Sequence, residues 1–101
     1  MSDKVLSLLG LAARGRNLVS GEFSTEKAIK EGKAELVIVS REASENTRDM
    51  FTNKCAFYET PIYFYGTKEE LGHAIGKEMR ASMAVIDAGL AAGIMKHLEE
   101  S

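Results

Sequence analysis

The sequence predicts an α/β fold, a three-layer α-β-α sandwich with a mixed four-stranded sheet and about five helices. Two observations predict it. Segments with apolar residues at helical spacing alternate along the chain with short, continuous apolar runs, and the connections between them are short. No proline-rich or serine-rich linker divides the 101 residues, a length that suits one domain over residues 1–101.

A first helix is predicted near the start of the chain. Ser2 and Asp3 are N-cap residue types, and apolar side chains follow at helical spacing over residues 5–12. We expect this helix to end near Gly15, because glycine adopts the left-handed conformation at little cost. A very short strand is expected after it, over residues 18–19.

A second helix is predicted to open at residues 20–21 and to end at Gly32. Its expected inner face carries Thr25, Ala28 and Ile29. The run E-L-V-I-V-S over residues 35–40 then predicts a central strand. Its β-branched residues and leucine follow one another without alternation, as in a strand that is buried on both faces.

The second half of the chain continues the alternation of helices and strands. Ser44 is a good N-cap for a third helix, and Pro61 fits the first position of a strand that continues through residue 65. Thr67-x-x-Glu70 has the form of a capping box for a fourth helix. Residues 82–86 predict another buried strand, and an apolar stripe predicts a last helix: Leu90, Ala91, Ile94, Met95 and Leu98.

Composition and charge exclude several classes of protein. Hydrophobic residues at 45% and charged residues at 28% are typical of globular chains and argue against disorder. The single cysteine excludes a disulfide scaffold and suits a reducing compartment, and no apolar run approaches the ~18 residues of a membrane helix. We expect a cytoplasmic protein with no membrane partner. The net charge of −2 excludes a polybasic surface, yet it allows a small basic patch.

The sequence shows no catalytic, cofactor or metal motif. It has neither a dinucleotide fingerprint nor a phosphate-binding loop, and His73 and His97 have no partner at ligand spacing. Cys55 is interpreted as a buried hydrophobe and Asp87 as the N-cap of the last helix. Three tyrosines are interpreted as strand and core residues, in preference to a base-stacking surface: Tyr58, Tyr63 and Tyr65. We therefore expect a protein that is not an enzyme and holds no cofactor or metal.

A small-molecule enzyme stays open as an alternative on the α/β fold alone. A pocket that contained both Asp87 and His73, with strongly shifted pKa values, would support it.

Several basic residues fall beside connections that an alternating fold gathers at one edge of the sheet: Arg14, Arg16, Lys27, Arg41, Lys77 and Arg80. Helix N-termini at such an edge point free N–H groups outward and can bind phosphate. Acidic residues are then expected elsewhere: Glu69, Glu70, Glu99 and Glu100. The alternative is a solvated surface of mixed charge, which composition by itself favours.

Two stretches of the chain are more specific, S-G-E-F-S-T-E-K-A-I-K-E-G-K-A-E-L-V-I-V-S over residues 20–40 and L-G-H-A-I-G-K-E-M-R-A-S-M-A-V-I-D-A-G over residues 71–89. Both resemble the ribosomal protein L7Ae/L30e family of kink-turn RNA-binding proteins. The opening L-L-G-L-A-A-R-G-R-N-L-V-S-G, residues 8–21, is most similar to the small bacterial branch called YlxQ-like. The resemblance covers essentially the whole chain, and the family's α-β-α sandwich agrees with the elements predicted above.

The resemblance implies binding to RNA kink-turns, which are sharply bent duplexes built around tandem sheared G·A pairs. The second helix would present its N-terminus to the widened groove, with Gly21 allowing close approach and Lys27 donating to guanine and phosphate. The loop 77–81 would pack against an extruded base. Arg14 and Arg16 would position the RNA backbone. The implied RNA-binding residues are Arg14, Arg16, Gly21, Phe23, Ser24, Lys27, Arg41, Lys77, Met79 and Arg80.

Phe23 and Ser24 depart from the family pattern, since many members carry Asn-Glu at these positions. Asn and Glu suit hydrogen bonds to base edges, whereas Phe packs or stacks. The leading hypothesis is a monomeric, non-catalytic protein that binds structured RNA, either ribosomal RNA, with the ribosome as its partner, or another noncoding RNA. The alternative is a substrate-recognition module for a separate RNA-modifying enzyme.

Overall fold

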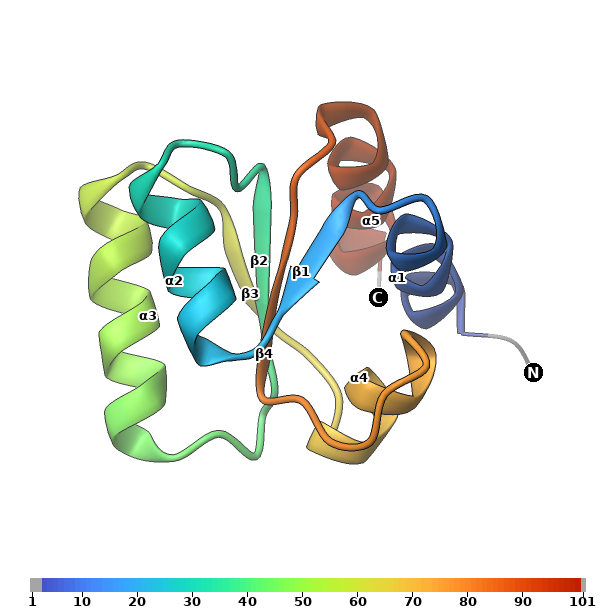
Figure 1. The fold of residues 1–101 in the computed structure, drawn as a ribbon, viewed down its shortest axis with the longest axis horizontal. Coiled ribbons are helices and arrows are strands. Elements are labelled where there is room, and N and C mark those ends of the chain that lie inside the picture. Colours follow the sequence, from blue (N-terminus) through green and yellow to red (C-terminus); the bar gives the residue numbers. More distant parts are fainter. Residues whose placement is uncertain (1–2, 101) are drawn as a thin grey trace.

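The computed structural model describes residues 3–100, in which helices and strands alternate (Figure 1). Five helices lie in this part of the chain: α1 (Lys4–Arg14), α2 (Glu22–Lys30), α3 (Glu45–Phe57), α4 (Lys68–Ala74) and α5 (Ala88–Glu100). The strands between them are β1 (Leu18–Ser20), β2 (Leu36–Val39), β3 (Ile62–Phe64) and β4 (Ser82–Val85). This is the order of elements predicted from the sequence.

The strands form one mixed sheet in the order β1-β4-β2-β3. β4 is antiparallel to both β1 and β2, whereas β2 and β3 are parallel. Three strands therefore run in one direction, and their carboxyl ends lie at the same edge of the sheet as the start of β4. We call this the carboxyl edge, and it comprises Ser20, Val39, Phe64 and Ser82 with the connections that follow or precede them.

Helices cover both faces of the sheet, with α2 and α3 on one side and α1, α4 and α5 on the other (Figure 1). The side chains of β2 point alternately to the two faces. Leu36 and Ile38 pack with α1, α4 and α5, and Val37 and Val39 pack with α2 and α3. All four are fully buried, which confirms the predicted central strand and the three-layer sandwich.

Side-chain caps begin the helices where the sequence predicts them. Asp3 accepts a hydrogen bond of 3.0 Å from the N–H of Leu6, while Ser2 lies outside the described residues. The side chain of Ser44 caps α3, and the capping box of Thr67 and Glu70 is complete in α4. At α5, the carboxylate of Asp87 accepts from the N–H of Leu90 at 2.9 Å. Each cap satisfies a backbone N–H that a helix leaves free in its first turn.

The turn after α1 differs from the prediction. Gly15 has a φ of −87°, and the left-handed residue is Arg16, with a φ of 61°. The N–H of Arg16 donates to the carbonyl of Ala13, and the N–H of Asn17 donates to that of Ala12. This pair of bonds places the left-handed conformation one position after the cap residue. The sequence argument was therefore wrong by one residue.

The predicted strands and tyrosines also need correction. β2, β3 and β4 are each shorter than predicted, and Pro61 stands just before β3, where its carbonyl accepts from the N–H of Val37. Tyr63 and Tyr65 pack against the core as expected. Tyr58 does not, because it follows the last turn of α3 and is 41% exposed, with its ring against that of Phe57.

Candidate nucleic-acid interface

The carboxyl edge brings together the start of α2 and the loop before β4. The N–H of Gly21 donates to the carbonyl of Ser82 at 2.9 Å. Beside it, Nε of Arg80 donates to Oγ of Ser20 at 3.2 Å, although the two residues are 60 positions apart in the sequence. The two stretches that the sequence analysis singled out therefore meet at one place.

The start of α2 carries no side-chain cap. Its N-cap is Gly21, with a φ of 92° that L side chains rarely adopt. A Cβ on Gly21 would meet nothing within 4 Å, so the surface above it is open. The first N–H groups of the helix lack a capping side chain and can donate to an anion that approaches over this glycine.

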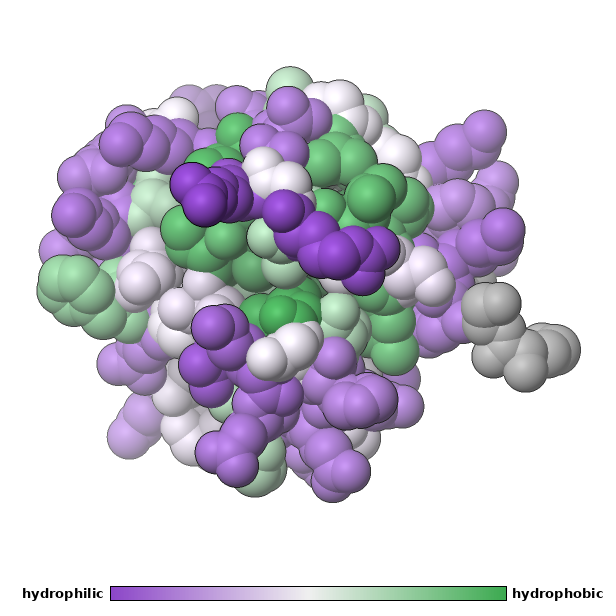
Figure 2. Space-filling model, turned by 45° about the vertical axis from the view of Figure 1, so that its right-hand side comes forward, coloured by the Kyte–Doolittle hydropathy of each residue, from purple (hydrophilic) through white to green (hydrophobic). Residues whose placement is uncertain are grey.

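A shallow hollow runs along α2 beside the edge strand β1. Its walls carry Phe23, Ser24 and Lys27, and its other residues are Val19, Ala28, Glu31, Lys33 and Ile86. Figure 2 shows apolar surface between hydrophilic side chains on the side of the molecule where β1 forms the edge of the sheet. Phe23 is 77% exposed, so its ring is available to stack on a planar group.

The loop between α4 and β4 is folded tightly against α4. The N–H of Lys77 donates to the carbonyl of Gly72 at 2.8 Å, and the N–H of Arg80 donates to that of Lys68 at 3.0 Å. Met79 is 58% exposed at the outside of the loop. Sequence reasoning missed Gly72, a buried residue in the middle of α4. A glycine within a helical pattern was the available signal for a close backbone contact.

The basic candidates are free of ion pairs within residues 3–100. The ion pairs in this range use other bases, namely Lys30, Lys33, Lys54 and His97. None of the following lies within 4.0 Å of a carboxylate oxygen there: Arg14, Arg16, Lys27, Arg41, Lys77 and Arg80. Their charges can therefore pair with phosphate without first breaking an ion pair.

The sequence argument expected the acidic residues to lie away from the carboxyl edge, but some of them lie at it. α4 starts from the carboxyl edge, and both Glu69 and Glu70 lie in its first turn. Glu70 completes the capping box, and Glu42 accepts a hydrogen bond from the N–H of Lys68 at 3.0 Å. These two carboxylates already accept hydrogen bonds from backbone N–H groups at the start of α4. Their negative charge also lowers the attraction of this helix end for phosphate.

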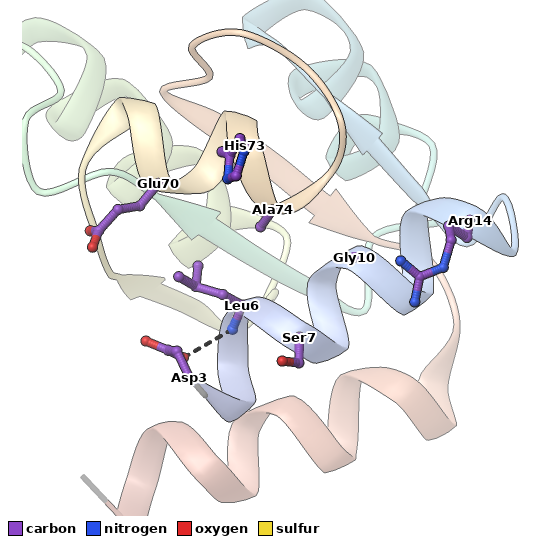
Figure 3. Close-up of a pocket in the computed structure, with 8 residues that line it drawn as sticks. All are labelled: Asp3, Leu6, Ser7, Gly10, Arg14, Glu70, His73 and Ala74. Carbon is purple, nitrogen blue, oxygen red and sulfur yellow. Dashed lines mark hydrogen bonds between the residues drawn. The ribbon is translucent and has the colours of Figure 1, made fainter. Parts of the chain in front are cut away.

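Three of the candidate arginines lie away from the start of α2 and the loop before β4. Arg41 is at the carboxyl edge, but its guanidinium carbon lies 5.6 Å from the ring centroid of Tyr65, next to β3. Arg14 and Arg16 are at the opposite end of β1 from Gly21, since they precede that strand. The side chain of Arg14 lies in a groove between α1 and α4 (Figure 3).

Cys55, His73 and Asp87 lie in separate surroundings, since Cys55 is buried, His73 lines two hollows and Asp87 caps α5. Among residues 3–100, no group of three potential ligand residues could hold a metal ion. The hollows that His73 lines do not include Asp87, whose carboxylate is used as a helix cap. Burial raises the pKa of the Cys55 thiol to about 11, which makes this residue a poor nucleophile at neutral pH.

Comparison with known proteins assigns the chain to a family. Residues 3–94 match the ribosomal protein L7Ae/L30e/S12e/Gadd45 family. The chain belongs to this family. The RNA-binding protein YlxQ of Bacillus subtilis is 41% identical over 92 residues, which cover 91% of this chain and 92% of that protein. The large ribosomal subunit protein eL30 of Neurospora crassa is 38% identical over 87 residues, covering 80% and 76% of the two chains.

Two solved structures share the fold of this chain. A protein of unknown function from Bacillus halodurans superposes with a TM-score of 0.94 at 40% identity, over 97% of this chain and 99% of that one. The Giardia lamblia 15.5kD RNA binding protein superposes with a TM-score of 0.83 at 23% identity, over 99% and 92%, and shows the same fold. None of the helices between residues 3 and 100 combines the length and apolar character needed to cross a membrane.

Proposed function

We propose that this protein is a non-catalytic RNA-binding protein that recognises a kink-turn at its carboxyl edge. The observation that carries the proposal is the contact between Arg80 and Ser20, which joins the exposed loop before β4 to the uncapped start of α2. The names of two relatives support RNA as the ligand, since one is an RNA-binding protein and the other a large ribosomal subunit protein.

The start of α2 would bind the bent region of the RNA. The N–H groups after Gly21 would donate to a phosphate, and Lys27, one turn further along, would donate to a guanine acceptor or a second phosphate. Phe23 would stack on a base, and the hydroxyl of Ser24 would donate or accept at its edge. Recognition by stacking would thus replace part of the base-edge hydrogen bonding expected from Asn-Glu.

The loop before β4 would hold an extruded base. Met79 exposes apolar surface for that base, and Arg80 is fixed beside it by bonds to Ser20 and to the carbonyl of Met79. Lys77 and Arg41 lie further along the carboxyl edge and would pair with phosphates. Arg14 and Arg16, at the opposite end of β1 from Gly21, would position the RNA backbone beyond the kink-turn without reading sequence.

The protein would act by shifting a conformational equilibrium of the RNA. A surface that contacts both sides of a bend binds the bent state more tightly than the extended one, so binding increases the bent population. We expect one domain over residues 1–101, acting as a monomer in the cytoplasm on ribosomal or other noncoding RNA.

Titration of two labelled RNAs tests this function. One contains the tandem G·A pairs, and the other is a duplex of the same length with Watson–Crick pairs in their place. We expect tighter binding to the first RNA, together with an increase in energy transfer between dyes at its two ends. Equal affinity for both RNAs would remove the kink-turn proposal, and no binding to either would remove RNA as the ligand.

A further inference from the structure

A groove lies between α1 and α4 (Figure 3). Its lining residues are Asp3, Leu6, Ser7, Gly10, Arg14, Glu70, His73 and Ala74. A Cβ on Gly10 would lie 2.6 Å from the carbonyl oxygen of Ala74, so the two helices approach backbone to backbone. The floor of the groove is therefore formed partly by the bare backbone at Gly10.

The two ends of the groove differ in charge. Asp3 and Glu70 lie at one end, and Arg14 lies at the other (Figure 3). The carboxylate of Asp3 accepts hydrogen bonds from the N–H of Leu6 and the hydroxyl of Tyr65, and that of Glu70 caps α4. These acids are engaged in the fold, whereas Arg14 forms no ion pair within residues 3–100. The Arg14 end is thus the part that attracts an anion.

The loop before β4 lines a second hollow. His73 lines both the groove and this second hollow, which it shares with Gly76, Lys77, Glu78 and Arg80. Glu78 brings one carboxylate into this hollow, but it forms no ion pair with Lys77 or Arg80. A path of basic side chains therefore leads from Arg80 through Lys77 and His73 to Arg14.

We propose that this path binds an RNA arm that extends beyond the kink-turn, with phosphates contacted by Arg14 and His73. The inference rests on the proposed function, because the path starts at Arg80, which that function places beside the extruded base. Several unpaired basic groups along a polar groove suit a chain of phosphates better than an apolar peptide. Five of the eight residues that line the groove carry polar or charged side chains.

The test compares RNAs that differ only in the length of their arms. One is a minimal kink-turn, and the others carry the same core with either helical arm lengthened. Affinities for the wild type, Arg14→Ala, His73→Ala and the control Lys96→Ala are measured over a range of salt concentrations. Lys96 is an exposed base on α5 and lines neither hollow, so its removal matches the change in charge.

We expect Arg14→Ala to weaken binding to one long-arm RNA about 3- to 10-fold and to lower its salt slope by about 0.9, as the loss of one phosphate contact requires. His73→Ala should weaken the same complex, and binding to the minimal kink-turn should stay within about twofold of the wild type. Lys96→Ala should change neither complex.

Equal losses on minimal and long-arm RNA, or no loss on either, would overturn the proposed path. If wild-type protein fails to distinguish the minimal kink-turn from a plain duplex, the proposed function itself has failed. Arg14→Gln keeps the long polar side chain, and thermal unfolding of both Arg14 variants separates loss of contact from loss of fold. If Arg14→Ala is destabilised and Arg14→Gln is not, the binding result of Arg14→Gln is the one that counts. Unchanged binding of Arg14→Gln to the long-arm RNA would then also overturn the proposed path.

Discussion

A Cβ on Gly72 would lie 1.8 Å from the carbonyl oxygen of Glu78. No side chain can fit there, because real Cβ atoms essentially never approach another atom below 3.0 Å and the obstructing atom is backbone. The loop that presents Met79 and Arg80 therefore holds its position only because residue 72 is glycine.

Gly72→Ala should displace this loop. We expect the unfolding free energy to fall by about 1–3 kcal/mol, as for other overpacked sites, and RNA affinity to fall at least tenfold. Urea unfolding and RNA titration measure the two effects. Gly93→Ala is the control, because a Cβ there meets nothing within 4 Å and alanine favours the helix by about 0.5–1 kcal/mol. Normal RNA binding by a folded Gly72→Ala variant would show that the loop is not a contact.

Phe23→Ala should weaken RNA binding without changing stability. The ring is 77% exposed, so its removal costs the fold within about 0.5 kcal/mol, whereas loss of base stacking costs about 1–3 kcal/mol of binding. Phe57→Ala is a matched control, because Phe57 is 79% exposed and lies at the end of α3, away from the carboxyl edge. Phe23→Tyr should bind as the wild type does. Equal effects of the Phe23 and Phe57 truncations to alanine would argue against stacking.

Lys27→Ala should weaken binding by about 1–3 kcal/mol, because the amine forms no ion pair within residues 3–100 and the side chain lines the same hollow as Phe23 and Ser24. Lys30 provides the comparison one turn further along, where Nζ lies 3.8 Å from a carboxylate oxygen of Glu26. Such an exposed pair contributes well under about 1 kcal/mol to stability, so Lys30→Ala should leave both the unfolding free energy and the RNA affinity nearly unchanged. Filter binding at fixed salt distinguishes the two lysines, and the reverse ranking would place the RNA elsewhere on α2.

Cys55 should make stability fall in alkaline solution. Burial raises its pKa from the ordinary 9.0 to about 11. Between these values the unfolded chain releases the thiol proton and the folded chain keeps it, so rising pH favours unfolding. The stabilisation is complete below pH 9 and is lost as pH approaches 11.

Urea unfolding of the wild type and of Cys55→Ala between pH 8 and 11 isolates this effect. Tyr65, whose pKa is raised to about 12 chiefly by burial, titrates in both proteins and cancels in the difference. We expect the advantage of the wild type over Cys55→Ala to shrink with pH. A constant difference would mean that the thiol is not responsible.

Local patterns predicted most elements and their caps because these depend on neighbours in the sequence. Ser44 and Thr67 bond N–H groups three residues away, and the continuous apolar run of β2 shows that both its faces are buried. The turn after α1 was misplaced because glycine's conformational freedom allows a left-handed residue without requiring one. Hydrogen bonds to Ala12 and Ala13 fixed that conformation at Arg16.

The sequence by itself determined the alternation of helices and strands, the family motifs and the residue types of the proposed RNA surface. Only the tertiary structure decided which of those residues meet. The strand order β1-β4-β2-β3 puts Ser20 beside Arg80 and leaves Arg14 in a groove against α4. Strand pairing and helix docking join residues that are far apart in sequence, so these contacts cannot be predicted from the local spacing of residues.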